Sequence, residues 1–196
     1  MKQLTLLFLL LLPFVKSFAQ DTSVEKSLWG VQMGVHPLSF YNETALSNSI
    51  TLRSELGFGF AYSSSSISGT EQWAVVPTVI VEPRYYYNLN RRTRLKKRTD
   101  WNSGNYLSLN LGYELGAFAI TSKDTEVFSS VHLIPMYGFR RNMGAKFNFE
   151  MAFGIGGAWT FEDYVLTDYN TQKPITVNET DFDVAYGLRL AIGYVF

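Results

Sequence analysis

Apolar residues at every second position are the feature that most constrains what this chain can fold into. Near the C-terminus they occupy eight consecutive alternate positions, namely Phe182, Val184, Tyr186, Leu188, Leu190, Ile192, Tyr194 and Phe196. This period of two is typical of β-strands, whose side chains point alternately to two faces. The same period recurs upstream from residue 28, and no helical period of similar strength accompanies it. We therefore expect an all-β fold.

The alternating segments number seven or eight, depending on how residues 28–46 are divided. Pro37 has no backbone donor and interrupts this stretch, which favours two strands over one. Single-chain bacterial β-barrels have even strand numbers, which also favours eight. The sequence therefore predicts an eight-stranded antiparallel up-and-down transmembrane β-barrel. Its expected strands cover about 28–36, 38–46, 50–62, 73–88, 105–118, 128–141, 145–158 and 181–196.

The volume of the alternating side chains indicates which face points outward. An eight-stranded barrel has an interior just wide enough for side chains to fill, so it cannot hold bulky residues from every strand. The opposite face is rich in Gly and Ala and fits a narrow interior. Charged residues make up only 17% of the chain, and a bulky apolar outer wall suits lipid better than water. No apolar run reaches the roughly 18 residues of a membrane-spanning helix, so strands would carry the chain across.

Charged residues on the expected inward face are balanced in sign. They are Arg53, Glu55, Glu82, Arg84, Glu114, Arg140, Glu150 and Arg189. A lone charge inside a narrow barrel would cost several kcal/mol, so we expect ion pairs that fill the interior. The alternative is a gated ion or proton path. Selective pores more often carry rings of one sign, which favours the filled interior.

Residues 1–19 have the pattern of a secretory signal peptide. Lys2 supplies the positive charge, residues 4–12 are apolar, and Ser17 and Ala19 place small residues where a signal peptidase reads them. We therefore expect cleavage after Ala19 and a barrel domain over 20–196. The expected location is the outer membrane of a Gram-negative bacterium.

A run of six basic residues follows the fourth expected strand, comprising Arg91, Arg92, Arg94, Lys96, Lys97 and Arg98. A periplasmic N-terminus would place residues 89–104 on the periplasmic side, and the longer loops 63–72, 119–127 and 159–180 outside. The basic run is then either a solvated turn beside lipid phosphates or a docking site for an anionic headgroup or periplasmic partner. Tyr85, Tyr86 and Tyr87 would form an aromatic girdle next to it. Nothing in the sequence points to nucleic-acid binding.

Several segments resemble the small eight-stranded outer-membrane β-barrels of Gram-negative bacteria, the class of the OmpA transmembrane domain and OmpX. They are the leader 1–19, the turn region 138–156, the segment 82–92 and the terminal stretch 186–196. The resemblance implies that Leu190, Ile192, Tyr194 and Phe196 form the assembly signal for the barrel insertion machinery. It implies an architecture but no activity. Pro77, Pro83 and Pro135 depart from the pattern because they fall inside expected strands.

Candidate catalytic and metal-binding residues are few. The chain has no cysteine, and its two histidines are His36 and His132. Ser39 and Glu43 follow His36, but this spacing does not define a catalytic triad. We expect no cofactor, no metal and no enzyme activity. The expected function is structural or interactive, through the outer loops and the basic turn, with outer-membrane lipid as a partner. The alternatives are a narrow channel for small solutes and a secreted lipocalin-like carrier whose bulky face points inward.

Overall fold

The computed structural model describes residues 23–65, 70–122, 127–167 and 174–196. The predicted leader lies outside these residues. The described strands are β1 (Ser27–Gly34), β2 (Ser39–Ala45), β3 (Ile50–Ser65), β4 (Thr70–Tyr86), β5 (Asn105–Glu114), β6 (Ile120–Thr121), β7 (Ser129–Met143), β8 (Phe147–Thr167) and β9 (Pro174–Val195). The helical elements are α2 (Leu89–Arg94), η1 (Asp100–Asn102) and η2 (Gly116–Phe118).

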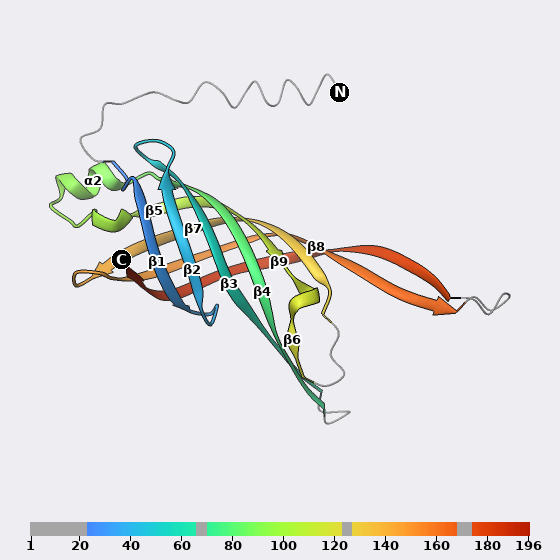
Figure 1. Ribbon diagram of the computed structural model, residues 1–196. Helices are drawn as coiled ribbons and strands as arrows, with labels where there is room; N and C mark the ends of the chain where they lie inside the picture. Colours follow the sequence, from blue (N-terminus) through green and yellow to red (C-terminus); the bar gives the residue numbers. More distant parts are fainter. Residues whose placement is uncertain (1–22, 66–69, 123–126, 168–173) are drawn as a thin grey trace, which may run out of the picture.

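The strands form a single antiparallel sheet that closes into a ring (Figure 1). β1 pairs with both β2 and β9, and β3 pairs with both β2 and β4, so the first and last strands are joined. β4 pairs with β5 along one part of its length and with the short β6 farther along the same edge. Counting β5 and β6 as one position gives eight strands around the ring. The predicted all-β fold is confirmed, and residues 28–46 form two strands as expected.

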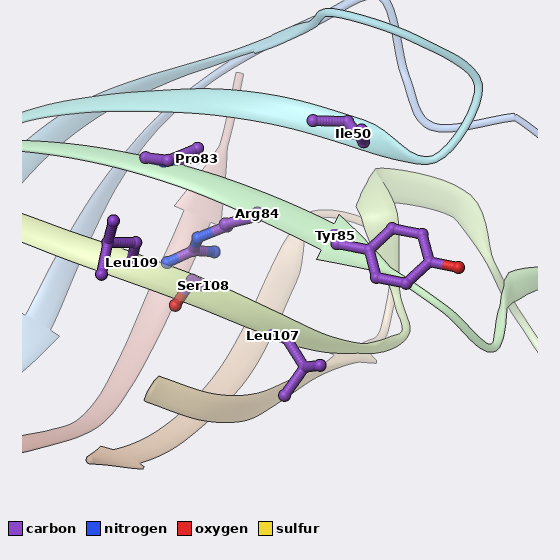
Figure 2. A pocket seen from close by; sticks show the side chains of 7 residues that line it. All are labelled: Ile50, Pro83, Arg84, Tyr85, Leu107, Ser108 and Leu109. Atoms are coloured by element: carbon purple, nitrogen blue, oxygen red, sulfur yellow. The ribbon is translucent and has the colours of Figure 1, made fainter. Parts of the chain in front are cut away.

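Burial alternates along the strands as the period of two predicts. On β4, Ile80, Glu82 and Arg84 are buried, while Val79, Val81 and Tyr85 are exposed. Figure 2 shows the same contrast for two neighbours on β4, because Arg84 and Tyr85 leave the strand in opposite directions. The apolar residues therefore form the outer wall, and most of the buried charged residues lie inside.

Several segments differ from the sequence prediction. Residues 63–72 were expected as a loop, but β3 continues to Ser65 and β4 begins at Thr70, and the expected loop 119–127 contains β6. Residues 159–180 were expected as a loop, but β8 continues to Thr167 and β9 begins at Pro174. The fifth strand was expected to reach residue 118, but it ends at Glu114 and η2 follows. Residues 89–104 were expected as a turn, and they contain α2 and η1 instead. Among the described residues, no helix is long and apolar enough to cross a membrane.

The strands differ greatly in length, so the ring is closed only over part of its height. β1 pairs with β9 from Gly30 opposite Val195 to Gly34 opposite Ala191. β9 continues beyond this point to Pro174 with β8 as its paired neighbour. Figure 1 shows the β8–β9 hairpin and the β3–β4 hairpin extending separately beyond the short β1–β2 hairpin. We call the other end, where α2 and the C-terminus lie, the cap end.

Pro83 and Pro135 lie inside strands without changing the register, and Pro77 marks the point where β4 changes partner from β5 to β6. Pro77 and Pro83 lie opposite Phe58 and Leu52 in an unbroken β3–β4 ladder. Pro135 lies opposite Leu109 on β5. Each of Pro83 and Pro135 leaves a short gap in the pairing on its other side, but the residue offset is the same before and after the gap. These two prolines therefore remove local pairs without inserting a bulge.

Candidate functional site

The interior of the ring holds a compact group of buried charges, which we call the ion cluster. Its members are Arg53, Arg84, Arg140, Arg189, Glu43, Glu55, Glu82 and Glu150. Seven of these were expected from the sequence, and Glu43 was not among the expected inward charges. Glu114 was expected there but lies at the end of β5, partly buried, where it accepts a hydrogen bond from Ser130 at 3.1 Å. The cluster therefore contains equal numbers of positive and negative side chains.

Glu150 lies at the centre of the ion cluster. Its Oε1 accepts hydrogen bonds from Arg84 Nη2 at 2.7 Å and from Arg189 Nη1 at 3.2 Å. Its Oε2 accepts from Arg140 Nη2 at 2.8 Å and lies 3.6 Å from Arg53 Nη1. One carboxylate thus contacts all four arginines. This is possible because Arg140 and Glu150 are direct cross-strand neighbours with inward side chains.

Glu43 forms a second contact point near the cap end. Its Oε2 lies 2.9 Å from Arg140 Nη1 and 3.5 Å from Arg84 Nη1. Its Oε1 accepts hydrogen bonds from Tyr86 at 2.9 Å and Asn102 at 2.8 Å. In the sequence, Glu43 stands out only as a possible acid near His36. Its position opposite Arg53 in the β2–β3 register could have identified it, had the exact pairing been known.

Arg53 and Arg189 link the remaining two carboxylates to the cluster. Arg53 donates from Nε to Glu55 at 2.8 Å, and Arg189 donates to Glu82 at 2.6 Å and to Glu55 at 3.2 Å. Arg53 also donates to Gln32 at 2.6 Å. Charge-assisted hydrogen bonds of this kind offset the large cost of removing ions from water.

Buried tyrosines fill the space around the arginines. The guanidinium of Arg53 lies 3.7 Å from the centre of the Tyr41 ring, and that of Arg84 lies 4.3 Å from the centre of the Tyr106 ring. Tyr106 also donates to Glu150 at 2.7 Å. Tyr86, expected in an outer aromatic girdle, is buried inside and packs against Tyr106. The girdle prediction is therefore wrong for Tyr86, while Tyr85 and Tyr87 are exposed.

Residues 89–104, which we call the cap, cover the end of the ring. Leu89, Asn102 and Ser103 are buried, and Leu89 belongs to a small core with Val24 and Tyr106. The Asn102 amide oxygen accepts from the Glu25 backbone at 2.8 Å, which ties the cap to the segment before β1. Trp101 donates from Nε1 to the Ala145 carbonyl at 3.0 Å. The cap is thus fixed to the β7–β8 turn as well as to the interior.

The six basic residues of the cap fall into two groups. Arg92 donates to the Arg98 carbonyl at 2.8 Å, and Arg98 donates to Asp100 and to the Gly144 carbonyl. These two arginines hold the cap together and fasten it to the β7–β8 turn. The hydrogen bond from Arg98 also lowers the pKa of the Asp100 carboxyl below its ordinary value. The other four residues, Arg91, Arg94, Lys96 and Lys97, are exposed.

The interior beyond the ion cluster, away from the cap, holds both histidines. His132 lies 2.8 Å from the Asn110 side-chain oxygen through Nε2, and its ring covers Gly112 on the neighbouring strand. A Cβ atom at Gly112 would come within 2.1 Å of this ring, so a larger residue there would displace the His132 side chain. His36 lies at the tip of the β1–β2 hairpin and is half-buried. No group of three potential metal ligands occurs within the described part of the chain.

Aromatic residues on the outer wall contact one another at several heights, including midway along β8, where the Tyr137 and Phe153 rings lie 5.8 Å apart. Near the cap end, Phe147 contacts Tyr194 and Tyr194 contacts Phe196, with ring centres 5.2 and 5.8 Å apart. Towards the far end, the Trp159 and Phe182 rings lie 5.4 Å apart. The four residues of the expected assembly signal, Leu190, Ile192, Tyr194 and Phe196, lie along this outer wall.

Between β4 and β5 the outer wall has a shallow apolar groove, at the gap left by Pro83. The groove is lined by Ile50, Pro83, Arg84, Tyr85, Leu107, Ser108 and Leu109 (Figure 2). It is open and nearly all its exposed lining is apolar. It offers no set of converging polar groups of the kind that orients a small polar ligand.

Compared with models of protein families, with curated proteins and with solved structures, the chain matches none. The charged side chains of the ion cluster contact one another and the buried tyrosines. They fill the interior and link the strands that carry them.

Proposed function

We propose that this protein is an integral outer-membrane β-barrel with a filled, ion-paired interior and a structural or interactive role. The observation that supports the proposal is that bulky apolar side chains lie on the outside of the ring and charged side chains lie inside it. Bulky side chains such as Phe153, Ile155 and Leu188 are more than half exposed, whereas Arg53, Arg84 and Arg140 are at most 1% exposed. A water-soluble protein of this size would gain by the opposite arrangement.

The dimensions of the apolar wall also favour a membrane. Phe147 and Trp159, which each belong to an aromatic pair on the outer wall, lie twelve residues apart on β8. At about 3.3 Å per residue, this is roughly 40 Å along the strand. With a strand tilt of about 45°, the height is roughly 28 Å. The apolar band of outer-membrane barrels is about 25 Å tall between its aromatic girdles.

Near the cap, where the ring is closed, it meets the main requirement that lipid places on the backbone. Hydrocarbon offers no hydrogen bonds, so spanning strands must pair with one another. In the half of the ring near the cap, each strand has a paired neighbour on both sides. Signal-directed export, cleavage after Ala19 and recognition of the terminal strand by the barrel insertion machinery belong to this proposal.

The interior favours a non-conducting barrel without enzyme activity. A channel needs a continuous polar path, but the ion cluster and the cap occupy the interior with side chains that are almost inaccessible to water. The lipocalin-like alternative needs an apolar internal cavity, and the interior contains eight charged residues instead. The narrow channel predicts conductance in planar bilayers, where the filled barrel predicts only background.

The experiment that tests this function is membrane fractionation followed by gel electrophoresis of unboiled and boiled samples. A closed membrane barrel should remain in the outer-membrane fraction and migrate faster when unboiled. Recovery only from the soluble fraction, with no heat-dependent shift, would overturn the proposal. Folded protein that conducts above background would instead favour the channel.

A further inference from the structure

Four exposed cations and one exposed leucine lie together on the cap. Arg91 and Arg94 belong to α2, and Leu95, Lys96 and Lys97 follow directly. Leu95 is 55% exposed. An apolar side chain surrounded by free cations is poorly suited to bulk water, but it suits a surface that is both anionic and partly apolar.

The height of this group matches the edge of the apolar wall. Tyr85 and Tyr87 have exposed rings on the outer wall, and α2 begins at Leu89, two residues after Tyr87. Tyr87 also donates to the Tyr137 hydroxyl at 3.2 Å, so the ring is fixed at this level. A six-residue helix is only about 9 Å long. Arg91 and Arg94 lie within this short helix, and Lys96 and Lys97 follow it at the same end of the ring.

The cap holds these cations on a rigid support. Arg92 and Arg98 donate hydrogen bonds within the cap and to the β7–β8 turn, to the Arg98 carbonyl, Asp100 and the Gly144 carbonyl. Lys96 has a φ of 54°, in the left-handed region, so the chain turns sharply directly after Leu95. The six basic residues therefore fall into two groups. Arg92 and Arg98 stabilise the cap through hydrogen bonds, and the side chains of the other four are exposed.

We propose that Arg91, Arg94, Lys96 and Lys97 bind phosphate groups of anionic lipid headgroups in the leaflet at the cap end, with Leu95 inserted between them. This inference rests on the proposed membrane function and names the ligand class of the basic turn. A lipid is favoured over an acidic soluble polymer because Leu95 and the tyrosine level adjoin the cations, and a headgroup offers both phosphate and hydrocarbon.

Native mass spectrometry of the folded full-length protein in neutral detergent tests this proposal. Phosphatidylglycerol and phosphatidylcholine are added in parallel, and bound lipids are counted. We expect wild type to prefer phosphatidylglycerol. The variant R91Q/R94Q/K96Q/K97Q should bind it about tenfold or more weakly, as expected for removing four surface cations. Leu95→Ser should weaken the binding of both lipids.

A matched pair of variants separates the cap from general positive charge at this end. R94Q/K97Q removes two cap cations, and K26Q/K146Q removes two exposed cations elsewhere near the cap end. The proposal requires a clearly larger loss of phosphatidylglycerol for the first pair. Equal losses, or unchanged binding by the fourfold variant, would overturn it. Displacement of the lipid by polyglutamate, with no preference between the two lipids, would assign the site to an acidic polymer instead.

The two proposals fail in different ways. A heat-dependent gel shift in every variant, without lipid preference, would contradict only the headgroup site. Absence of that shift in wild type would contradict the membrane barrel itself.

Discussion

The Asn102 side chain donates a hydrogen bond to Glu43 Oε1 at 2.8 Å, joining the cap to the ion cluster. Asn102 is completely buried and has a φ of 57°, a left-handed conformation that Asn tolerates better than most residues. Its amide oxygen accepts from the Glu25 backbone. One side chain therefore connects three parts of the molecule: the segment before β1, the cap and the interior.

Replacing Asn102 should loosen the cap without opening the ring. Asn102→Gly keeps the left-handed backbone accessible and removes both side-chain hydrogen bonds, one to Glu43 and one from the Glu25 backbone amide. We expect a loss of about 1–3 kcal/mol in the free energy of unfolding. Asn102→Ala should cost more, because it adds backbone strain. Denaturant unfolding in detergent measures both, and equal stability of Asn102→Gly and wild type would contradict the role of this contact.

Neutralising the central carboxylate should be the most damaging single change in the interior. Glu150→Gln keeps the volume but leaves four arginines with one fewer counter-charge. Removing one partner of a buried pair typically costs about 3–5 kcal/mol. Glu114→Gln is the matched control, since Glu114 lies outside the ion cluster, and we expect a change below about 1 kcal/mol. Similar destabilisation by the two variants would show that the cluster is not a distinct unit.

The two halves of β9 should differ in hydrogen exchange. The Leu190 carbonyl accepts from Val35 on the β1 side, whereas Val195 donates to Lys146 on the β8 side. Successive backbone amides along a strand point to opposite neighbours. The amides of Tyr186 and Leu188 therefore point toward the β1 side of β9, at a height that β1 does not reach. These amides should exchange faster than those of Ile192 and Tyr194.

Gly187 is the internal control for this exchange experiment, since its amide points toward β8 and should stay protected. The amides are followed by NMR in detergent micelles. Protection of Tyr186 and Leu188 equal to that of Gly187 would show that another strand covers this edge.

The Arg98–Asp100 pair should be detectable by titration. The hydrogen bond from Arg98 lowers the pKa of Asp100. The ionised pair therefore stabilises the folded protein fully at a pH above the ordinary Asp value, about 3.9. This stabilisation is lost as the pH falls through the lowered pKa. The pair is largely exposed, so its effect on stability should be small. Arg98→Gln should raise the pKa of Asp100 toward its ordinary value, as followed by NMR of the carboxyl carbon. An unchanged pKa would mean that the pair does not form in solution.

The period of two was sufficient to predict the all-β fold and the inward charges on most strands. The separation of β1 from β2 was predicted from Pro37 and from the even strand number of bacterial barrels. The period could not predict where long strands end. The residues of 159–180 alternate weakly and include polar positions typical of loops, yet 159–167 and 174–180 pair with each other as strands. Pairing across a two-stranded hairpin depends on register, which local composition does not encode.

The membership of the ion cluster depended on register in the same way. Glu43 and Glu114 both follow the sequence pattern of a carboxylate on or near an inward face, but only Glu43 lies at the height of the arginines. The cap was missed for another reason. Its basic residues suggested a solvated turn, while its fixed geometry depends on contacts of Asn102 and Trp101 with segments far away in sequence.

The most direct test of the central claim is to ask which face of β8 meets lipid. The chain has no cysteine, so a single introduced cysteine gives a unique label. Phe153→Cys and Ile155→Cys, which face outward, and Ala152→Cys, which faces the interior, are labelled with a fluorophore after reconstitution into vesicles. Lipids carrying a bromine quencher on the acyl chains should quench the two outward labels strongly and the inward label weakly. Quenching of the Ala152 label alone, or of none of the three, would contradict a membrane barrel with an apolar outer wall.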